Sequence, residues 1–185
     1  MADRPRLDEA TRPRAPQHPD AERTASGAAS AEMLVSVHAH LRSELEQIRD
    51  VIAEVATGRI AADTARSLIN DMSMRQNYWS LGAFCATFCR VLTVHHTIED
   101  VSVFPSLKTR DPELGPVIDR LVEEHEVVAE VLTRLDLALV AMVGHPESLS
   151  AVKAEVDRLS EVLLSHLAYE EEELIGPINR LGMEI

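Results

Sequence analysis

The sequence predicts an all-α protein, an up-down-up-down four-helix bundle with one extra short helix inserted between the first and second long helices. Three observations lead to this class. Of the 185 residues, 45 % are hydrophobic but only 3 % are aromatic, a composition that suits packed helices around one sizeable core. Hydrophobic residues recur with helical periodicity through four long segments. Alternating runs bounded by hairpin turns, which would indicate strands, are missing from the sequence.

The predicted helices follow one another with recognisable boundaries. Periodicity begins near Ala31 and stops near Gly58, and a shorter periodic segment follows. In the next long stretch, Pro105 predicts an end or a kink. The pair Gly176 and Pro177 predicts the end of the last helix. The elements expected in this way cover residues 31–58, 61–76 (the short helix), 78–110, 116–143 and 149–175.

The N-terminal part of the chain differs from the rest in composition. Residues 1–29 hold four of the nine prolines and almost no large hydrophobic residues. Such a segment buries too little apolar surface to offset the entropy of ordering it. We therefore expect a disordered tail over residues 1–29 and a four-helix domain over residues 30–180.

The charge of the chain argues against two classes of partner. The formal net charge is -13, without a concentrated stripe of Lys and Arg, so neither nucleic acid nor an anionic membrane surface is an expected partner. The sequence has no uninterrupted apolar stretch long enough for a membrane span, and its first residues lack the apolar core of a signal peptide. A cytoplasmic location is expected.

A pattern of histidines and glutamates indicates the function. His-x-x-x-Glu occurs once in the second long helix and once in the fourth, and single histidines lie in the other two long helices. A four-residue step returns to the same face of a helix, so each pair can point inward together. All four histidines share a face with large hydrophobic residues, and their heights along the bundle agree within roughly 3 Å. The six residues are His38, His95, Glu99, His125, His166 and Glu170.

Six polar side chains on core-facing positions need partners inside the bundle. Leaving them unpaired would cost on the order of 1–3 kcal/mol each. Imidazole and carboxylate groups together suit transition-metal cations, iron above all, so the sequence predicts a site for two metal ions. For any one histidine taken alone, a hydrogen-bonded core residue is the alternative.

His96 and Asp100 form a competing pair on a neighbouring face of the second long helix. We favour His95 with Glu99, because their face carries bulkier residues and a glutamate recurs in the same relation to His166. The alternative that His96 joins the metal shell stays open.

Other polar residues near the six are expected to play lesser parts. His40 lies about 200° around the helix from His38, which turns it outward or to the edge of the site. Tyr169 is expected to pack or hydrogen-bond near the site. The acidic run 171–173 reads as a solvated face from which Glu173 turns inward.

Several stretches resemble the hemerythrin-like family, often called the HHE cation-binding domain. They are His38-Ala-His-Leu-Arg42, His95-His-Thr-Ile-Glu99 running into Val103-Phe-Pro105, Glu124-His125, and His166-Leu-Ala-Tyr-Glu170. The resemblance spans about residues 32–177. It is also similar to the actinobacterial members that carry an extra helix after the first.

The resemblance implies two non-haem iron ions bridged by Glu99, Glu170 and an oxo or hydroxo group, with the four histidines as terminal ligands. Oxygen-carrying members have a fifth histidine where this chain has Ala129, a position that helical spacing from His125 puts on the core-facing side. The difference favours reaction with peroxide or nitric oxide, including a possible peroxide-decomposing activity, as much as binding of O2. An iron- or redox-sensing module and a metal-free helical interaction protein are the alternatives.

Overall fold

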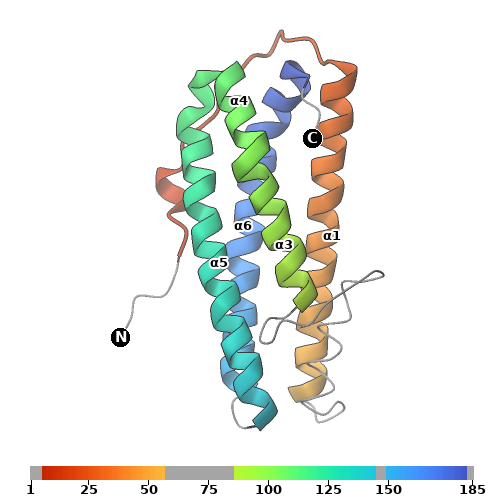
Figure 1. Cartoon of the computed structure of the whole chain (residues 1–185), viewed down its shortest axis with the longest axis vertical. Helices are drawn as coiled ribbons and strands as arrows, with labels where there is room; N and C mark the ends of the chain where they lie inside the picture. Colours follow the sequence, from red (N-terminus) through yellow and green to blue (C-terminus); the bar gives the residue numbers. More distant parts are fainter. Residues whose placement is uncertain (1–5, 57–85, 145–148, 183–185) are drawn as a thin grey trace.

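In the computed structural model, which describes residues 6–56, 86–144 and 149–182, four long helices run antiparallel to their neighbours (Figure 1). The second of them is built from two α-helices with a π-helix between them. The described residues contain no strand, so the predicted all-α bundle is confirmed. The long elements are α1 (Ala25–Ala56), α3 (Ala86–Ile98), the π-helix (Glu99–Val103), α4 (Phe104–Arg110), α5 (Gly115–Gly144) and α6 (Leu149–Leu181), with 3-10 turns at Glu9–Thr11 and Pro112–Leu114.

The predicted short helix over residues 61–76 lies outside the described residues. α1 begins earlier than the periodicity predicts, because Thr24 caps it: the Thr24 hydroxyl accepts a hydrogen bond from the Gly27 N–H at 3.0 Å. The Thr24 N–H in turn donates to the Asn179 carbonyl at 2.9 Å. The start of α1 is therefore tied to the end of α6.

The predicted end of the last helix at Gly176 and Pro177 is wrong. α6 continues through Pro177, which is buried inside the helix. Its end comes at Gly182, which adopts a positive φ of 67° and donates its N–H to the Ile178 carbonyl at 3.2 Å. A glycine in this left-handed conformation is a common helix terminator.

The second long helix does not end at Pro105 but continues to Arg110. The residues just before it form the π-helix, in which the Phe104 N–H donates to the Glu99 carbonyl, five residues back. Proline has no N–H for the regular ladder, and π-turns of this kind often occur at functional sites. The wider turn leaves Glu99 buried and the adjacent Asp100 half-buried, so that two successive carboxylates face the interior.

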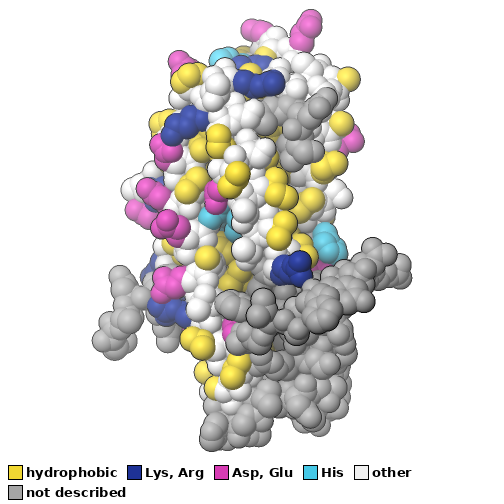
Figure 2. All heavy atoms as spheres, viewed as in Figure 1, with side chains coloured by type: hydrophobic (Ala, Val, Ile, Leu, Met, Phe, Trp, Pro, Cys, Tyr) yellow, Lys and Arg dark blue, Asp and Glu magenta, His cyan; other side chains and the backbone are white. Residues whose placement is uncertain are grey.

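The surface carries both charged and hydrophobic side chains, and Figure 2 shows hydrophobic ones along the face that α3 and α4 present. The exposed residues of the second long helix include Val94 and Ile98 of α3 and Val101 of the π-helix. None of the described helices combines the length and the apolar character that crossing a lipid bilayer demands.

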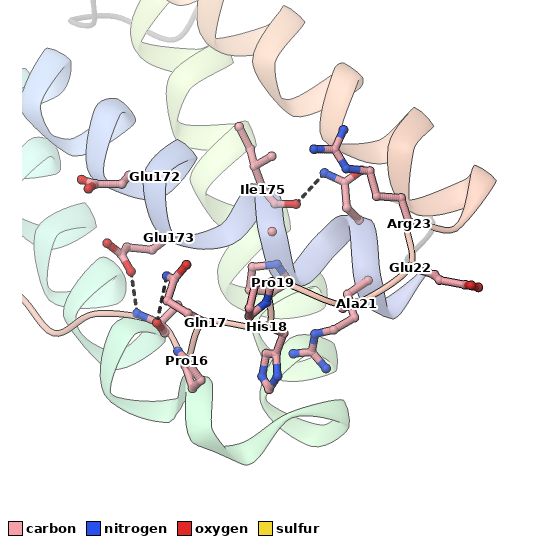
Figure 3. Close-up of a pocket in the computed structure, with 15 residues that line it drawn as sticks. Pro16, Gln17, His18, Pro19, Ala21, Glu22, Arg23, Glu172, Glu173 and Ile175 are labelled. Carbon is pink, nitrogen blue, oxygen red and sulfur yellow. Dashed lines mark hydrogen bonds between the residues drawn. The ribbon is translucent and has the colours of Figure 1, made fainter.

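Residues 6–24, expected to be part of a disordered tail, pack against the bundle instead. The segment runs beside α5 and crosses the end of the bundle to reach α1 (red in Figure 1). Leu7 packs against the hydrophobic core, and Ala15 is buried. Figure 3 shows part of this segment lying across α6. Residues 16–19 and 21–23 of the segment line a cavity of about 250 Å³. Side-chain hydrogen bonds to buried carboxylates, which composition does not reveal, hold the segment in place.

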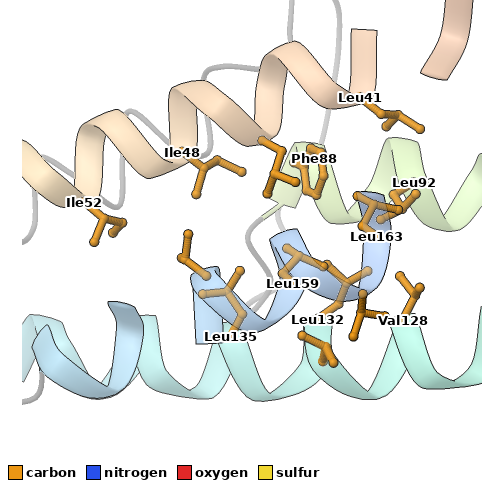
Figure 4. Packing of buried hydrophobic residues seen from close by; sticks show 14 of the residues in the cluster. Leu41, Ile48, Ile52, Phe88, Leu92, Val128, Leu132, Leu135, Leu159 and Leu163 are labelled. Carbon is orange, nitrogen blue, oxygen red and sulfur yellow. The ribbon is translucent and has the colours of Figure 1, made fainter. Parts of the chain in front are cut away.

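Two hydrophobic clusters fill the bundle, and a polar layer separates them. In α1 the upper cluster includes Leu34 and the lower cluster resumes at Leu41, while in α5 the corresponding residues are Leu121 and Val128. Figure 4 shows side chains of the lower cluster meeting from all four helices. The four predicted histidines occupy the gap. The labelled members of the lower cluster are Leu41, Ile48, Ile52, Phe88, Leu92, Val128, Leu132, Leu135, Leu159 and Leu163.

Candidate metal centre

The polar layer contains two groups of side chains whose ligand atoms lie within 4.8 Å of one another. The histidine group consists of His96, His125 and His166. The mixed group consists of His38, His95, Glu99 and Glu170. All six predicted residues therefore lie in the two groups, together with His96.

The two glutamates connect the groups. One oxygen of Glu99 lies 3.2 Å from Nε2 of His95, and the other lies 3.7 Å from Nε2 of His125. Oε2 of Glu170 lies 3.5 Å from Nε2 of His38 and 3.7 Å from Nε2 of His166. Each carboxylate thus contacts an imidazole of both groups.

Three of the histidines are held by carboxylates on the side away from the centre. Nδ1 of His38 contacts Glu171 at 2.9 Å, and Nδ1 of His125 contacts Asp100 at 2.9 Å. The partner of His166 Nδ1 is Glu124, at 3.2 Å. A partner on one ring nitrogen sets the tautomer and orientation of the other, which is the arrangement that metal-binding histidines commonly have.

Six of the atoms that face the centre lack ordinary partners. Among the described residues, both carboxylate oxygens of Glu99, Oε2 of Glu170 and Nε2 of His96, His125 and His166 are buried without a hydrogen bond. Buried polar atoms in folded proteins are nearly always paired. A cluster of unpaired nitrogen and oxygen donors pointing at one another fits the donor set of a transition-metal cation.

The electrostatics of the centre favour neutral imidazoles. Burial, with a smaller contribution from the nearby imidazoles, lowers the pKa of His95 to about 3. Burial likewise lowers the pKa of His125 to about 2 and that of His96 well below its usual range. Burial and the neighbouring Glu170 carboxylate raise the pKa of Glu99 to about 11. The site repels an extra proton on its histidines, and it also disfavours an uncompensated negative charge on Glu99. A bound cation would satisfy both conditions.

The sequence favours His95 over His96 as a metal ligand, whereas the structure places both residues in the same polar layer. The His96 ring stacks on His125, with centroids 3.9 Å apart and planes 7° from parallel. Adjacent residues differ by 100° around a helix, which is about the width of a core-facing stripe, so both can lie at its edges. Asp100, the partner of His96 in the competing pair, contacts His125 and belongs to neither group.

The neighbours of the site are partly as expected. His40 points outward, with its side chain 60 % exposed and its ring beside Glu44. Tyr169 is buried, and its hydroxyl donates to the Pro13 carbonyl of the N-terminal segment. Glu173 turns inward, as predicted. Glu171, expected on a solvated face, instead contacts His38.

Ala129 does not lie where its periodicity predicts. We expected it on the core-facing side of its helix, one turn after His125, but the structure leaves it exposed. The third nitrogen beside His125 and His166 comes from His96, on a different helix.

Comparison with known proteins gives one match. The model of the hemerythrin HHE cation binding domain matches residues 29–177, which include both groups and most of the four helices. No curated protein and no solved structure matches the chain.

Proposed function

Because this chain belongs to the hemerythrin HHE cation-binding family, we propose that it holds two non-haem iron ions in the polar layer and binds or reacts with O2, peroxide or nitric oxide there. The observation that supports the proposal best is the pair of carboxylates shared by two groups of imidazoles. Two cations placed side by side need shared anionic ligands between them and neutral donors around them.

The histidine group and the mixed group would each hold one iron. The histidine group supplies three nitrogens, and the mixed group supplies two nitrogens. Glu99 and Glu170 would be shared. When bound, the iron pair supplies redox chemistry and a coordination position for a small ligand.

The rest of the chain prepares this position. Asp100, Glu124 and Glu171 orient three imidazoles before any metal arrives, which lowers the entropic cost of binding it. The hydrophobic clusters on either side exclude water, so the reacting ligand would meet few mobile protons. Each charge change in the layer must then be balanced by residues already in it.

A sensing role for the same iron pair is the second candidate. It is favoured by the contact between the N-terminal segment and Glu124, the partner of His166. A change at the iron pair could reach the surface through that contact.

Rapid mixing of the iron-reconstituted chain with O2, peroxide and nitric oxide in turn tests the proposal. Catalytic turnover of peroxide would indicate an enzyme, and a reversible optical change with O2 would indicate a carrier. A stable optical change without turnover would favour a sensor. An iron-loaded chain whose spectrum responds to none of the three would overturn the proposed function.

A further inference from the structure

The N-terminal strap, residues 6–24, contacts the bundle through the side chain of Arg12, which is largely buried. The guanidinium of Arg12 donates from Nε and Nη2 to the two oxygens of Glu124, both at 2.8 Å. The Arg12 side chain is only 10 % exposed and that of Glu124 only 2 %. A two-pronged pair of this kind fixes the plane of the carboxylate as well as its position.

The side chain of Tyr169 fixes the same part of the strap. The guanidinium carbon of Arg12 lies 4.6 Å from the centre of the Tyr169 ring, a cation–π contact. The Tyr169 hydroxyl donates to the carbonyl of Pro13, the next residue of the strap, at 2.8 Å. Arg12 is therefore held on its charged group and on its backbone neighbour at once.

Glu124 connects Arg12 to the metal centre. The same oxygen, Oε2, accepts from Arg12 and contacts Nδ1 of His166. An equivalent chain occurs on the other side of the layer, where Arg42 donates to Glu171 at 2.7 Å and Glu171 contacts His38. Arg42 belongs to α1, one of the helices of the bundle. Arg12 belongs to the strap, which packs on the outside of the bundle.

We propose that Arg12 is a positioning residue for the metal centre: it holds Glu124 and, through it, His166, so that docking of the strap and retention of the cation are linked. This inference rests on the proposed function. Outer partners of ligating histidines typically change metal affinity about 10–100-fold when they are removed. Linkage is reciprocal, so a bound cation would also tighten the strap.

The strap has a second anchor that offers a matched control. Arg14 donates to Glu173 at 2.7 Å. The Ala15 N–H donates to the other oxygen of Glu173 at 2.5 Å, a bond drawn as a dashed line at Glu173 in Figure 3. Glu173 belongs to neither group of candidate ligands. Arg14→Gln removes an exposed contact of the strap but leaves the Ala15 anchor and the Arg12–Glu124 pair in place, so the strap stays docked and the chain of contacts to His166 is intact.

The experiment compares Arg12→Gln, Arg14→Gln and Arg12→Lys in the full chain, with two readouts. The first is the rate at which a strong chelator removes iron from the reconstituted protein. We expect Arg12→Gln to raise this rate about 10-fold or more and Arg14→Gln to stay within about 2-fold of the wild type. Arg12→Lys, which keeps the charge but not the two-pronged geometry, should lie between them.

The second readout is the NMR signal of the His166 imidazole in the metal-free chain. Arg12→Gln should shift or broaden it, whereas Arg14→Gln should not. Equal effects of the two substitutions on iron loss, or an unchanged His166 signal in Arg12→Gln, would overturn the inference. If the wild type takes up no iron, the proposed function fails, and the NMR comparison alone decides whether Arg12 positions His166. If Arg12→Gln does not fold, Arg12→Lys carries both comparisons.

Discussion

Acidification of the metal-free protein from pH 7 to 5.5 should lower its free energy of unfolding. Burial lowers the pKa of His95 to about 3 and that of His125 to about 2, from an ordinary value of 6.5, and also lowers the pKa values of His38 and His96. Below pH 6.5 the histidines of the unfolded chain therefore bind protons that the same histidines in the folded chain do not bind. Stability is present above pH 6.5 and is lost as the pH falls towards the pKa values of the folded state.

The size of the loss follows from linkage. For a histidine whose folded-state pKa lies far below 5.5, as for His95, His96 and His125, lowering the pH from 7 to 5.5 costs slightly more than about 1 kcal/mol, so the three together cost roughly 4 kcal/mol. Glu99 acts in the opposite direction: its pKa is raised to about 11 from 4.5, so the folded chain keeps a proton that the unfolded chain releases. That contribution returns roughly 2 kcal/mol over the same range. The net loss of about 2 kcal/mol is a sizeable part of a typical stability of about 5–15 kcal/mol.

Urea unfolding of the chelator-treated chain, followed by circular dichroism at pH 7 and 5.5, measures the loss. His125→Phe removes one histidine but keeps a ring to stack on His96, so it should reduce the loss by about 1 kcal/mol. His40→Gln, at a side chain that is 60 % exposed, is the control and should behave as the wild type. A free energy of unfolding that is the same at both pH values, or that falls equally in His125→Phe and the wild type, would refute the reasoning.

Four further substitutions, with His40→Ala as a control, test the site and the packing. Glu99→Ala should abolish the two-metal site, while His40→Ala should leave iron content near normal, and equal losses in metal analysis would mean that the facing assignment is wrong. His96→Ala should lower iron content from about two to about one per chain, because it removes a nitrogen from only one group; unchanged content would exclude His96 as a ligand. Gly27→Ala should destabilise the chain by about 1–3 kcal/mol in urea unfolding, since a Cβ there would lie 2.4 Å from the Asn179 carbonyl oxygen. The opposite sign, a gain of roughly 0.5–1 kcal/mol, is expected for Gly176→Ala, whose Cβ would meet nothing within 4 Å.

Helical periodicity predicts the parts of this protein that depend on local pattern. The four long helices and the common level of the histidines follow from spacing, because residues at a fixed rise per position reach the same height. The His38 and His95 Nε2 atoms lie 3.1 Å apart although 57 positions separate them in the chain. The inward turn of Glu173 follows from the same geometry.

The departures arise where the backbone leaves a straight α-helix or where distant segments meet. A rotation of 100° per residue cannot anticipate the π-helix, which turns Asp100 towards His125. It also cannot decide between His95 and His96 when both lie at the edges of one stripe.

The strap shows a different limit. Its proline-rich composition is that of a disordered segment, but Arg12 is paired with a glutamate 112 positions away. A single ion pair of that separation leaves no periodic signal in the sequence. The hydrophobic Leu7 and the pattern of arginines between prolines are the only local hints of a docked segment.

Iron content after anaerobic reconstitution and removal of loosely bound metal tests the central claim most directly. If the two groups joined by Glu99 and Glu170 form one centre, the wild-type chain should retain about two irons. A content of about 0.5 iron per chain or less after the same treatment would contradict the account and favour a metal-free helical protein.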